Sequence, residues 1–172
     1  LLSCIAFFQC GDKISEIESS SPDGKVKVNF FLTEEGNAGY LINYSDKRVI
    51  DTSYCGFDFQ NEPPFKDNLE IINSYTSSFD ETWETVWGEQ RFIRNNYNEL
   101  KIELKEKDDK ERRFFIVFRV FDDGVGFRFE FPRQENLKDV VIIDENTQFK
   151  LTGDHTTWWS PGDWDIYEHL FN

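Results

Sequence analysis

The residues best suited to chemistry lie in the last fifteen positions, WWSPGDWDIYEHLFN (158–172). This segment combines three tryptophans with three acidic residues: Trp158, Trp159, Asp163, Trp164, Asp165 and Glu168. Sugar rings present apolar C–H faces that pack on aromatic rings, and hydroxyl groups that bind carboxylates. Aromatic walls with a few well-placed polar groups are the usual lining of a ligand site. The segment therefore fits a carbohydrate site.

The same side chains allow two other interpretations. Carboxylate oxygens are the ligands that a hard cation such as Ca²⁺ prefers. A purely structural role is also open, because tryptophans in β-proteins usually pack in the core and acidic side chains usually stay in water. Spacing alone does not choose among a sugar site, a calcium site and ordinary packing.

A second segment, DETWETVWGEQRFIRNNYNEL (80–100), raises the same alternatives. Trp83 and Trp87 flank two glutamates, and RNNYNE (94–99) is rich in amide and charged groups. Either the segment lines a sugar cleft, or it is a long loop held in place by two buried indoles. It has no clean hydrophobic period, so we expect a structured loop or an irregular strand from Asp80 to Asn96.

Other kinds of chemistry are excluded by composition. His155 and His169 are the only histidines, so a His-rich metal centre cannot be built from this chain. The sequence contains no Gly-rich phosphate-binding pattern. Its net charge of -14 opposes a phosphate backbone, which requires clustered lysines and arginines, so we expect no nucleic-acid partner.

The first residues have the composition of an export signal. LLSCIAFF is an apolar run too short to span a bilayer, and residues 1–10 are expected to be a truncated signal peptide or lipoprotein leader. LLSC resembles a bacterial lipobox ending in Cys4, whereas QCGDK around Cys10 fits less well. Residues 11–24 are Ser-rich and predict a tether. We expect export to the periplasm or outer membrane, with a lipid anchor as the only membrane contact; the alternative is a buried N-terminal strand.

The elements that must position these side chains read as β-strands. Aromatic residues make up 17% of the chain and suit pleated, half-buried surfaces. The clearest signal is RFFIVFRVFDDGVGFRFEF (113–131), in which apolar residues alternate on both limbs. Asp123-Gly124 lies between the limbs and predicts a type I′ hairpin turn.

Shorter stretches repeat the β pattern. Further strands are expected over 25–32, on both sides of Ser45-Asp46 within 40–50, and over 54–59, 69–78, 139–144 and 147–151. The adjacent prolines in QNEPPFKDN (60–68) indicate a loop. Cys55 is expected to be a small buried hydrophobe, since no histidine or basic residue is near it in sequence. Roughly ten short strands without an amphipathic helix predict an all-β fold, an antiparallel sandwich or barrel.

Together the motifs resemble the N-terminal domain of glycoside hydrolase family 97, a family of bacterial α-glucosidases and α-galactosidases. The resemblance is carried, in the family's order, by SPDGKVKV (21–28), ETWETVWGE with RNNYNEL (81–100), FRVFDDGVGFRFEFP (118–132) and WWSPGDWDIYEHLF (158–171). Asn96 stands where the family commonly has His, and Ile166 where it has Ser. Polar contacts near these two positions are therefore expected to differ.

The resemblance implies a multidomain parent. Residues 25–172 would form an incomplete N-terminal β-sandwich of the supersandwich type, which is followed in the family by a catalytic (β/α)₈ barrel and a small C-terminal β domain. The catalytic carboxylates lie mostly in the barrel, so no catalytic residue is assigned to this chain. The barrel is its expected partner.

The resemblance also implies site residues. In calcium-dependent members one Ca²⁺ ligand is a glutamate of the N-terminal domain, and Glu168 is the candidate for it here. Trp158, Trp159, Asp163 and Asn96 are the candidate contacts to an α-linked oligosaccharide.

Three functions remain as hypotheses. The first is the N-terminal, substrate-cleft domain of an exported α-glycosidase, silent when separated from its barrel. The second is a stand-alone carbohydrate-binding module whose exposed tryptophans hold a glycan. The third is a structural β-sandwich of a cell-surface protein, with every tryptophan buried.

Overall fold

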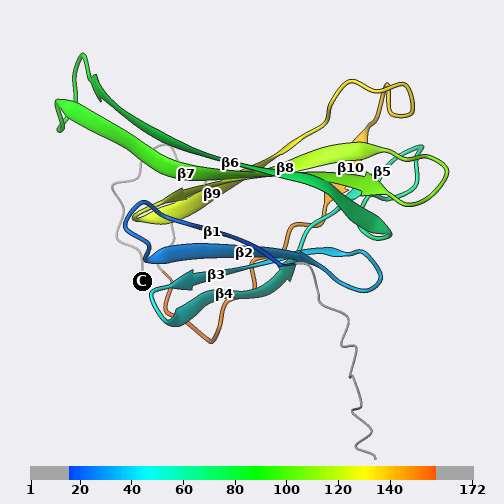
Figure 1. The fold of residues 1–172 in the computed structure, drawn as a ribbon, viewed down its shortest axis with the longest axis horizontal. Coiled ribbons are helices and arrows are strands. Elements are labelled where there is room, and N and C mark those ends of the chain that lie inside the picture. The colour runs from blue at the N-terminus through cyan, green and yellow to red at the C-terminus, as the bar shows by residue number, and fades with distance from the viewer. Residues whose placement is uncertain (1–15, 158–172) are drawn as a thin grey trace, which may run out of the picture.

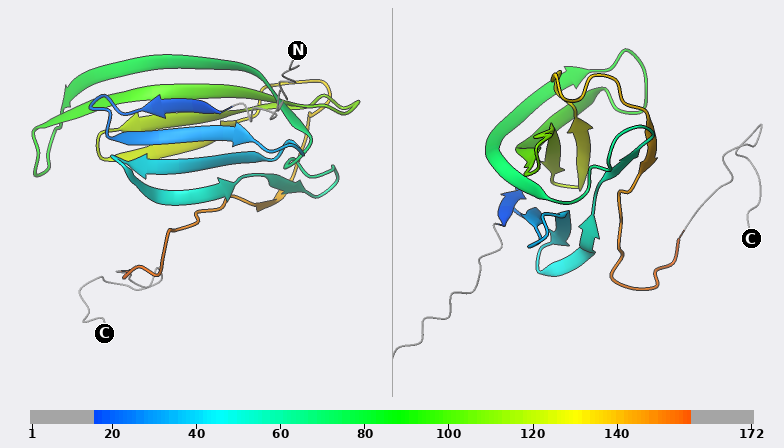
Figure 2. Two further views of the ribbon diagram at one scale, coloured as in Figure 1. Left: turned by 60° about the horizontal axis from the view of Figure 1, so that its bottom comes forward. Right: turned by 90° about the vertical axis from the view of Figure 1, so that its right-hand side faces the viewer.

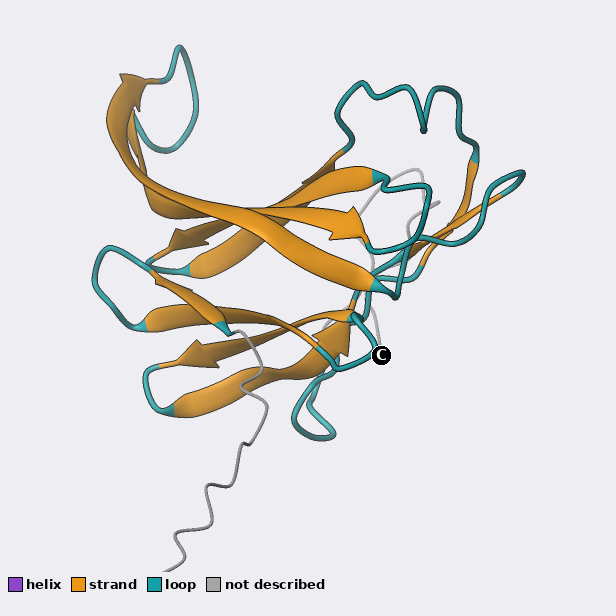
Figure 3. Cartoon of the chain, turned by 45° about the vertical axis from the view of Figure 1, so that its right-hand side comes forward, coloured by secondary structure: helices purple, strands orange, loops and turns teal. Residues whose placement is uncertain are grey.

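The computed structural model describes residues 16–157, and all regular structure in this range is β-strand (Figure 3). The strands are β1 (Ile17–Ser20), β2 (Val26–Leu32), β3 (Ala38–Tyr44), β4 (Lys47–Tyr54), β5 (Phe57–Phe59), β6 (Leu69–Glu84), β7 (Phe92–Glu106), β8 (Arg113–Phe121), β9 (Gly124–Glu130) and β10 (Ile142–Glu145). Over these residues the structure offers no helix that could cross a membrane.

The strands form two four-stranded antiparallel sheets and one small sheet. One sheet has the order β1-β2-β3-β4 and the other β6-β7-β8-β9, while β5 pairs with β10. The two larger sheets lie face to face, as Figure 1 and the end-on view of Figure 2 show. The predicted all-β, antiparallel sandwich is therefore confirmed.

Aromatic rings fill the space between the sheets. Phe118 of β8 is fully buried and packs against Phe30 of β2, Tyr40 of β3 and Phe127 of β9, at ring-centroid distances of 6.3, 6.0 and 5.6 Å. Tyr40 keeps its hydroxyl satisfied by donating to the Gln148 carbonyl oxygen at 2.6 Å. The core thus joins residues that are far apart in sequence, which is what a sandwich requires.

A buried ion pair closes one end of the core. Arg112 donates to the Glu106 carboxylate, with Nε 2.6 Å from Oε2, and both side chains are almost completely buried. The same guanidinium donates to the carbonyl oxygens of Pro63 and Pro64 at 3.0 and 3.3 Å. The Pro-Pro loop predicted from sequence is therefore held by one arginine.

The two large sheets are also joined where the β2–β3 turn meets the start of β6. Gly36 has a φ of +78°, and a Cβ there would lie 2.4 Å from the Leu69 backbone nitrogen. The Leu69 N–H donates to the Gly36 carbonyl oxygen at 3.1 Å. Only glycine allows this approach, because any side chain would collide with backbone atoms.

The predicted hairpin over 113–131 is confirmed, but its turn is different. The ladder closes at Phe121 opposite Gly124, so the turn residues are Asp122 and Asp123. Neither of them has the positive φ that a type I′ turn needs, so the predicted turn type is wrong. The strand pattern fixes the hairpin, but the Asp-Gly pair lies one position too late to form the turn itself.

Three other expectations need correction. Residues 80–96 are largely regular, because β6 continues to Glu84 and β7 begins at Phe92, and only 85–91 form the expected structured loop. The stretch 147–151 is not a strand and makes only one isolated bridge, between Leu151 and Ile50. The predicted tether ends early, because β1 pairs with β2, opposing Ile17 to Phe30, and Ser21 is buried. The polar composition of this edge strand hides it from a hydrophobicity pattern.

Candidate functional site

The most distinctive surface is the long hairpin formed by the outer halves of β6 and β7, which we call the arm (residues 73–98). In Figure 1 the arm projects beyond the sandwich, and its tip turns away from both sheets. The buried core cluster takes residues of β6 and β7 only from outside it, namely Leu69, Leu100, Ile102 and Leu104. The arm is therefore an extension of the sandwich and adds little to its core.

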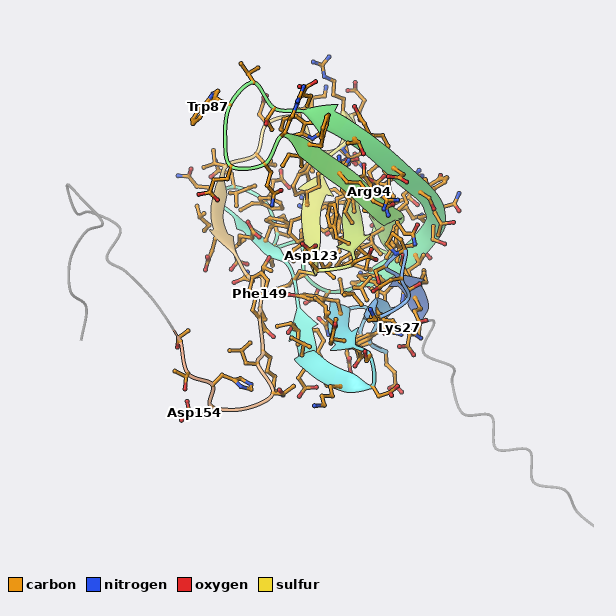
Figure 4. The ribbon with its side chains drawn as sticks, turned by 90° about the vertical axis from the view of Figure 1, so that its left-hand side faces the viewer. Lys27, Trp87, Arg94, Asp123, Phe149 and Asp154 are labelled. Carbon is orange, nitrogen blue, oxygen red and sulfur yellow. The ribbon has the colours of Figure 1, made fainter. Side chains whose placement is uncertain are left out.

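Both tryptophans of the arm face water. Trp83 is 49% exposed and Trp87, at the tip, is 89% exposed. Figure 4 shows the Trp87 side chain pointing away from the body of the protein. The interpretation of this segment as a loop held by two buried indoles is therefore wrong for this chain.

One face of the arm is aromatic. Residues two apart on a strand share a face, so Tyr75, Phe79 and Trp83 line up along β6. Phe79 stacks on Tyr97 of β7 at a centroid distance of 5.3 Å, and Tyr97 contacts Phe121 of β8 at 5.1 Å. The row offers flat rings to an apolar partner or to the C–H face of a sugar.

The opposite face of the arm is polar and contains Asn96. The Cα partner of Asn96 is Asp80, whose carboxylate accepts two hydrogen bonds from Arg94, at 2.8 and 2.7 Å. This interaction lowers the pKa of Asp80, so the carboxylate stays charged. Nearby, the Asn98 side-chain amide donates to the Ser20 carbonyl oxygen at 2.8 Å and ties the base of the arm to β1.

A tight polar turn lies at the same end of the sandwich. The Asp23 backbone N–H donates to the Asp122 carboxylate at 2.8 Å, which joins the β1–β2 turn to the β8–β9 turn. Hydrogen bonds from the side chain and backbone of Lys25, and from Ser21, hold the pKa of Asp23 well below its usual range. The hydrogen bonds to Asp80 and the charge of that carboxylate raise the pKa of Arg94, and the negative charge of Asp122 adds to this effect.

Three of the four sequence motifs therefore meet at one end of the molecule (Figure 4). These are the 21–28 segment, the arm with Arg94, and the β8–β9 turn with Asp123. They are separated by about 70 and about 30 residues in sequence, so the antiparallel topology alone brings them together. Hydrophobic patterning predicts the strands, but it does not predict that these three segments lie close together.

The other candidate residues have different outcomes. Four of them lie outside the described residues, namely Trp158, Trp159, Asp163 and Glu168. Asn96 is therefore the one candidate whose position the structure describes. Between residues 16 and 157 no three acidic, His or Cys side chains gather in a way that would hold a metal ion. Cys55 is buried as predicted, and burial raises the pKa of its thiol to about 12, which keeps it unreactive.

A hollow that the sequence did not reveal lies on the outer face of the β1–β4 sheet. Its volume is about 490 Å³, and its lining includes Phe31, Leu41 and Tyr54 with the carboxylates of Glu34 and Glu35. The Phe31 ring lies directly over Gly39 and meets Tyr54 edge-on at 6.5 Å. An aromatic side chain covering a glycine on a sheet is also a common means of stabilising strand pairing, so the hollow by itself assigns no function.

Most of the chain matches the model of a known protein family. The family model described as "Glycosyl-hydrolase 97 N-terminal" matches residues 20–172. The match includes the arm, the β1–β2 and β8–β9 turns, and the aromatic and acidic segment that follows residue 157.

Comparison with solved structures agrees. A Glycoside Hydrolase Family 97 enzyme from Pseudoalteromonas sp. strain K8, in complex with panose, is 31% identical with a TM-score of 0.81, covering 91% of this chain and 24% of that one. Its complex with acarbose gives the same values. A β-arabinopyranosidase, 24% identical with a TM-score of 0.71 over 78% of this chain and 21% of that one, shows the fold alone. The chain thus spans about a quarter of the length of these enzymes.

Proposed function

Because the chain belongs to glycoside hydrolase family 97, as its N-terminal domain, we propose that it is part of an exported bacterial enzyme that hydrolyses α-linked glucosides or galactosides. In this proposal the catalytic carboxylates belong to a (β/α)₈ barrel that follows in the same polypeptide. The present domain supplies one wall of the substrate cleft. Export, with a lipid on Cys4 as the anchor to the outer membrane, is part of the same proposal.

The observation that carries the proposal is the extent of the family match. It runs from residue 20 to residue 172 and so includes the segment richest in sugar-binding side chains. The Pseudoalteromonas enzyme that shares 31% identity has been crystallised with panose and with acarbose, and both are α-linked oligosaccharides. The end of the sandwich where the arm meets the β1–β2 and β8–β9 turns is consistent with this proposal. Hydrogen bonds there hold the charged side chains of Asp122, Asp80 and Arg94 in fixed positions.

The proposed sugar contacts combine stacking with hydrogen bonding. Trp158 and Trp159 would stack on the apolar faces of the sugar rings, and Asp163 would accept hydrogen bonds from hydroxyl groups. Asn96 has both a donor and an acceptor in its side chain, and it would contribute from the arm.

Calcium is proposed as the cofactor of the whole enzyme. Glu168 would provide one carboxylate ligand, and the remaining oxygen ligands would come from the barrel, since the described residues contain no cluster that could hold the ion. A bound Ca²⁺ would supply a fixed positive charge that orients the substrate or a general-acid partner.

The 172-residue chain alone is expected to show no hydrolysis of nitrophenyl α-glucoside or α-galactoside, whereas the longer polypeptide hydrolyses at least one of them. The reason is that the proposed catalytic pair lies outside this domain. Release of nitrophenol measures both samples, and turnover by the short chain would refute the proposal. Sub-millimolar binding of panose to the short chain, followed by tryptophan fluorescence, would instead favour the stand-alone binding module.

In the longer polypeptide, Glu168→Gln is expected to weaken Ca²⁺ binding and to lower kcat/KM by at least about tenfold, because groups that only support metal ligands already contribute about 10- to 100-fold. Calorimetric titration with Ca²⁺ measures the first effect, and hydrolysis with and without a chelator measures the second. Glu145→Gln removes an exposed carboxylate on β10 and is the matched control. If Glu168→Gln leaves both readings unchanged, Glu168 is not a ligand.

A further inference from the structure

We propose that the tip of the arm is an anchor that docks into an apolar pocket on the domain that follows in the same polypeptide. The anchor consists of Val86 and Trp87. This inference rests on the proposed function in one respect, namely that the chain is part of a longer glycosidase.

The exposure of the tip is the first reason. Val86 is completely exposed and Trp87 is 89% exposed, and the strand ends that carry this loop add Trp83 and Phe92, which are 49% and 58% exposed on opposite faces of the hairpin. Single exposed apolar residues are common, but four of them at the end of one projecting hairpin indicate an interaction surface. Tryptophan is also the residue most enriched among the energetic centres of protein interfaces.

The tip is presented in one ordered shape, which is the second reason. The Thr85 backbone N–H donates to the Arg91 carbonyl oxygen at 2.9 Å, and the Thr85 hydroxyl donates to the Gln90 carbonyl oxygen at 2.6 Å. Arg91 bridges to Glu84 at 2.8 Å across the base of the loop. A loop that is already closed loses little conformational entropy on binding, so its exposed side chains are suited to recognition.

The third reason is that the arm adds little to the buried core of this domain. The buried core cluster draws no residue from 72 to 99, although the strands that form the arm are 16 and 15 residues long. Buried Tyr97 packs on Phe121 at the base of the arm, but a two-stranded hairpin that projects beyond this contact is only marginally stable by itself, so contact with a partner would account for its length.

The chemistry of the tip favours a protein pocket over a glycan. Two acidic groups of the arm are already paired, Asp80 with Arg94 and Glu84 with Arg91, so a cationic partner would gain little from them. The sequence neighbours of Trp87 are Val86 and Gly88, which offer no polar side chain for sugar hydroxyls. An apolar pocket satisfies both residues at once.

The same polypeptide is the nearest source of such a pocket. This chain covers 22–24% of the length of the family 97 structures it matches, so about three quarters of each relative lies outside the match. The arm projects from the same end of the sandwich where the polar turns meet (Figure 1). A following domain seated on this end would meet the tip.

Hydrogen exchange in the longer polypeptide tests the inference. We expect the amides of residues 86–90 to exchange at least tenfold more slowly than those of the exposed β7–β8 turn (108–110), although both segments are solvent-exposed in this domain. Trp87→Ala should remove most of this protection. Ile143→Ala deletes an apolar side chain that is 63% exposed on β10, at the other end of the molecule, and should leave the protection unchanged.

The possible results are separable. Equal exchange at the tip and at the reference turn, or full protection retained in Trp87→Ala, would overturn the docking. Protection that appears only after panose is added would overturn it in favour of a glycan. Hydrolysis of α-glycosides by the same sample tests the proposed function independently: activity with an unprotected tip defeats only this inference, and a protected tip without activity defeats only the function.

Discussion

Replacing Arg112 by leucine is expected to lower the free energy of unfolding by about 3–5 kcal/mol, one of the two largest effects we expect from a single substitution in this domain. The substitution leaves the Glu106 carboxylate, which is 5% exposed, buried without its cation. It also removes the donors to the Pro63 and Pro64 carbonyl oxygens and the cation–π contact with Phe65, at 4.8 Å from the ring centroid. Urea unfolding followed by far-ultraviolet circular dichroism measures the change.

Two further variants separate the lost pair from a general effect of leucine. Arg113→Leu removes the neighbouring arginine, which is 48% exposed and pairs with Glu103 at 3.3 Å, and should cost about 1 kcal/mol or less. The double variant Arg112→Leu with Glu106→Leu should recover much of the loss, because no buried charge remains. A cost below about 1 kcal/mol for Arg112→Leu alone would contradict our account of the ion pair.

Phe118→Ala is expected to lower the free energy of unfolding by about 3–5 kcal/mol, because the Phe118 ring packs against rings of both sheets. It is fully buried and contacts Phe30, Tyr40 and Phe127, so its loss opens a cavity that none of these rings can fill without leaving its own position. Thermal and urea unfolding of the variant measure this cost.

The control for Phe118→Ala is the same substitution at an exposed ring. Phe92 is 58% exposed on the arm, so Phe92→Ala should change the free energy of unfolding by about 0.5 kcal/mol or less. Similar costs for the two variants would mean that the core is not organised around Phe118. A large cost for Phe92→Ala alone would mean that the arm contributes to the stability of this domain.

Strand patterning predicts the sandwich well where one face of a strand is buried. The hairpin over 113–131 is the best example, because Phe114, Ile116, Phe118 and Val120 are all at most 2% exposed, as their alternation predicts. Its turn type could not be predicted as reliably, because the choice of turn residues depends on the pairing register and not on the Asp-Gly pair alone.

The arm is poorly predicted for the opposite reason. Between Asp80 and Asn96 both of its faces meet solvent, so no hydrophobic period marks these residues, although Asp80 pairs with Asn96 in a regular ladder. The candidate site could be predicted from the sequence only in part. Residue types predict sugar-binding chemistry, but the proximity of Asp23, Asp122 and Arg94 depends on which strand ends lie side by side, and this is a property of topology.

The two-sided geometry of the arm also limits how such a hairpin can diverge. Each residue added to a strand advances it by about 3.3 Å and reverses its faces, so a change of one residue in both strands would exchange the aromatic row of Tyr75 and Phe79 with the polar row of Asp80 and Asn96. A change of two residues in both strands moves the tip by about 7 Å and keeps each row on its own side. Homologous hairpins that keep an aromatic face and a polar face should therefore differ in length by an even number of residues in each strand. Hairpins that differ by an odd number should be rare among them.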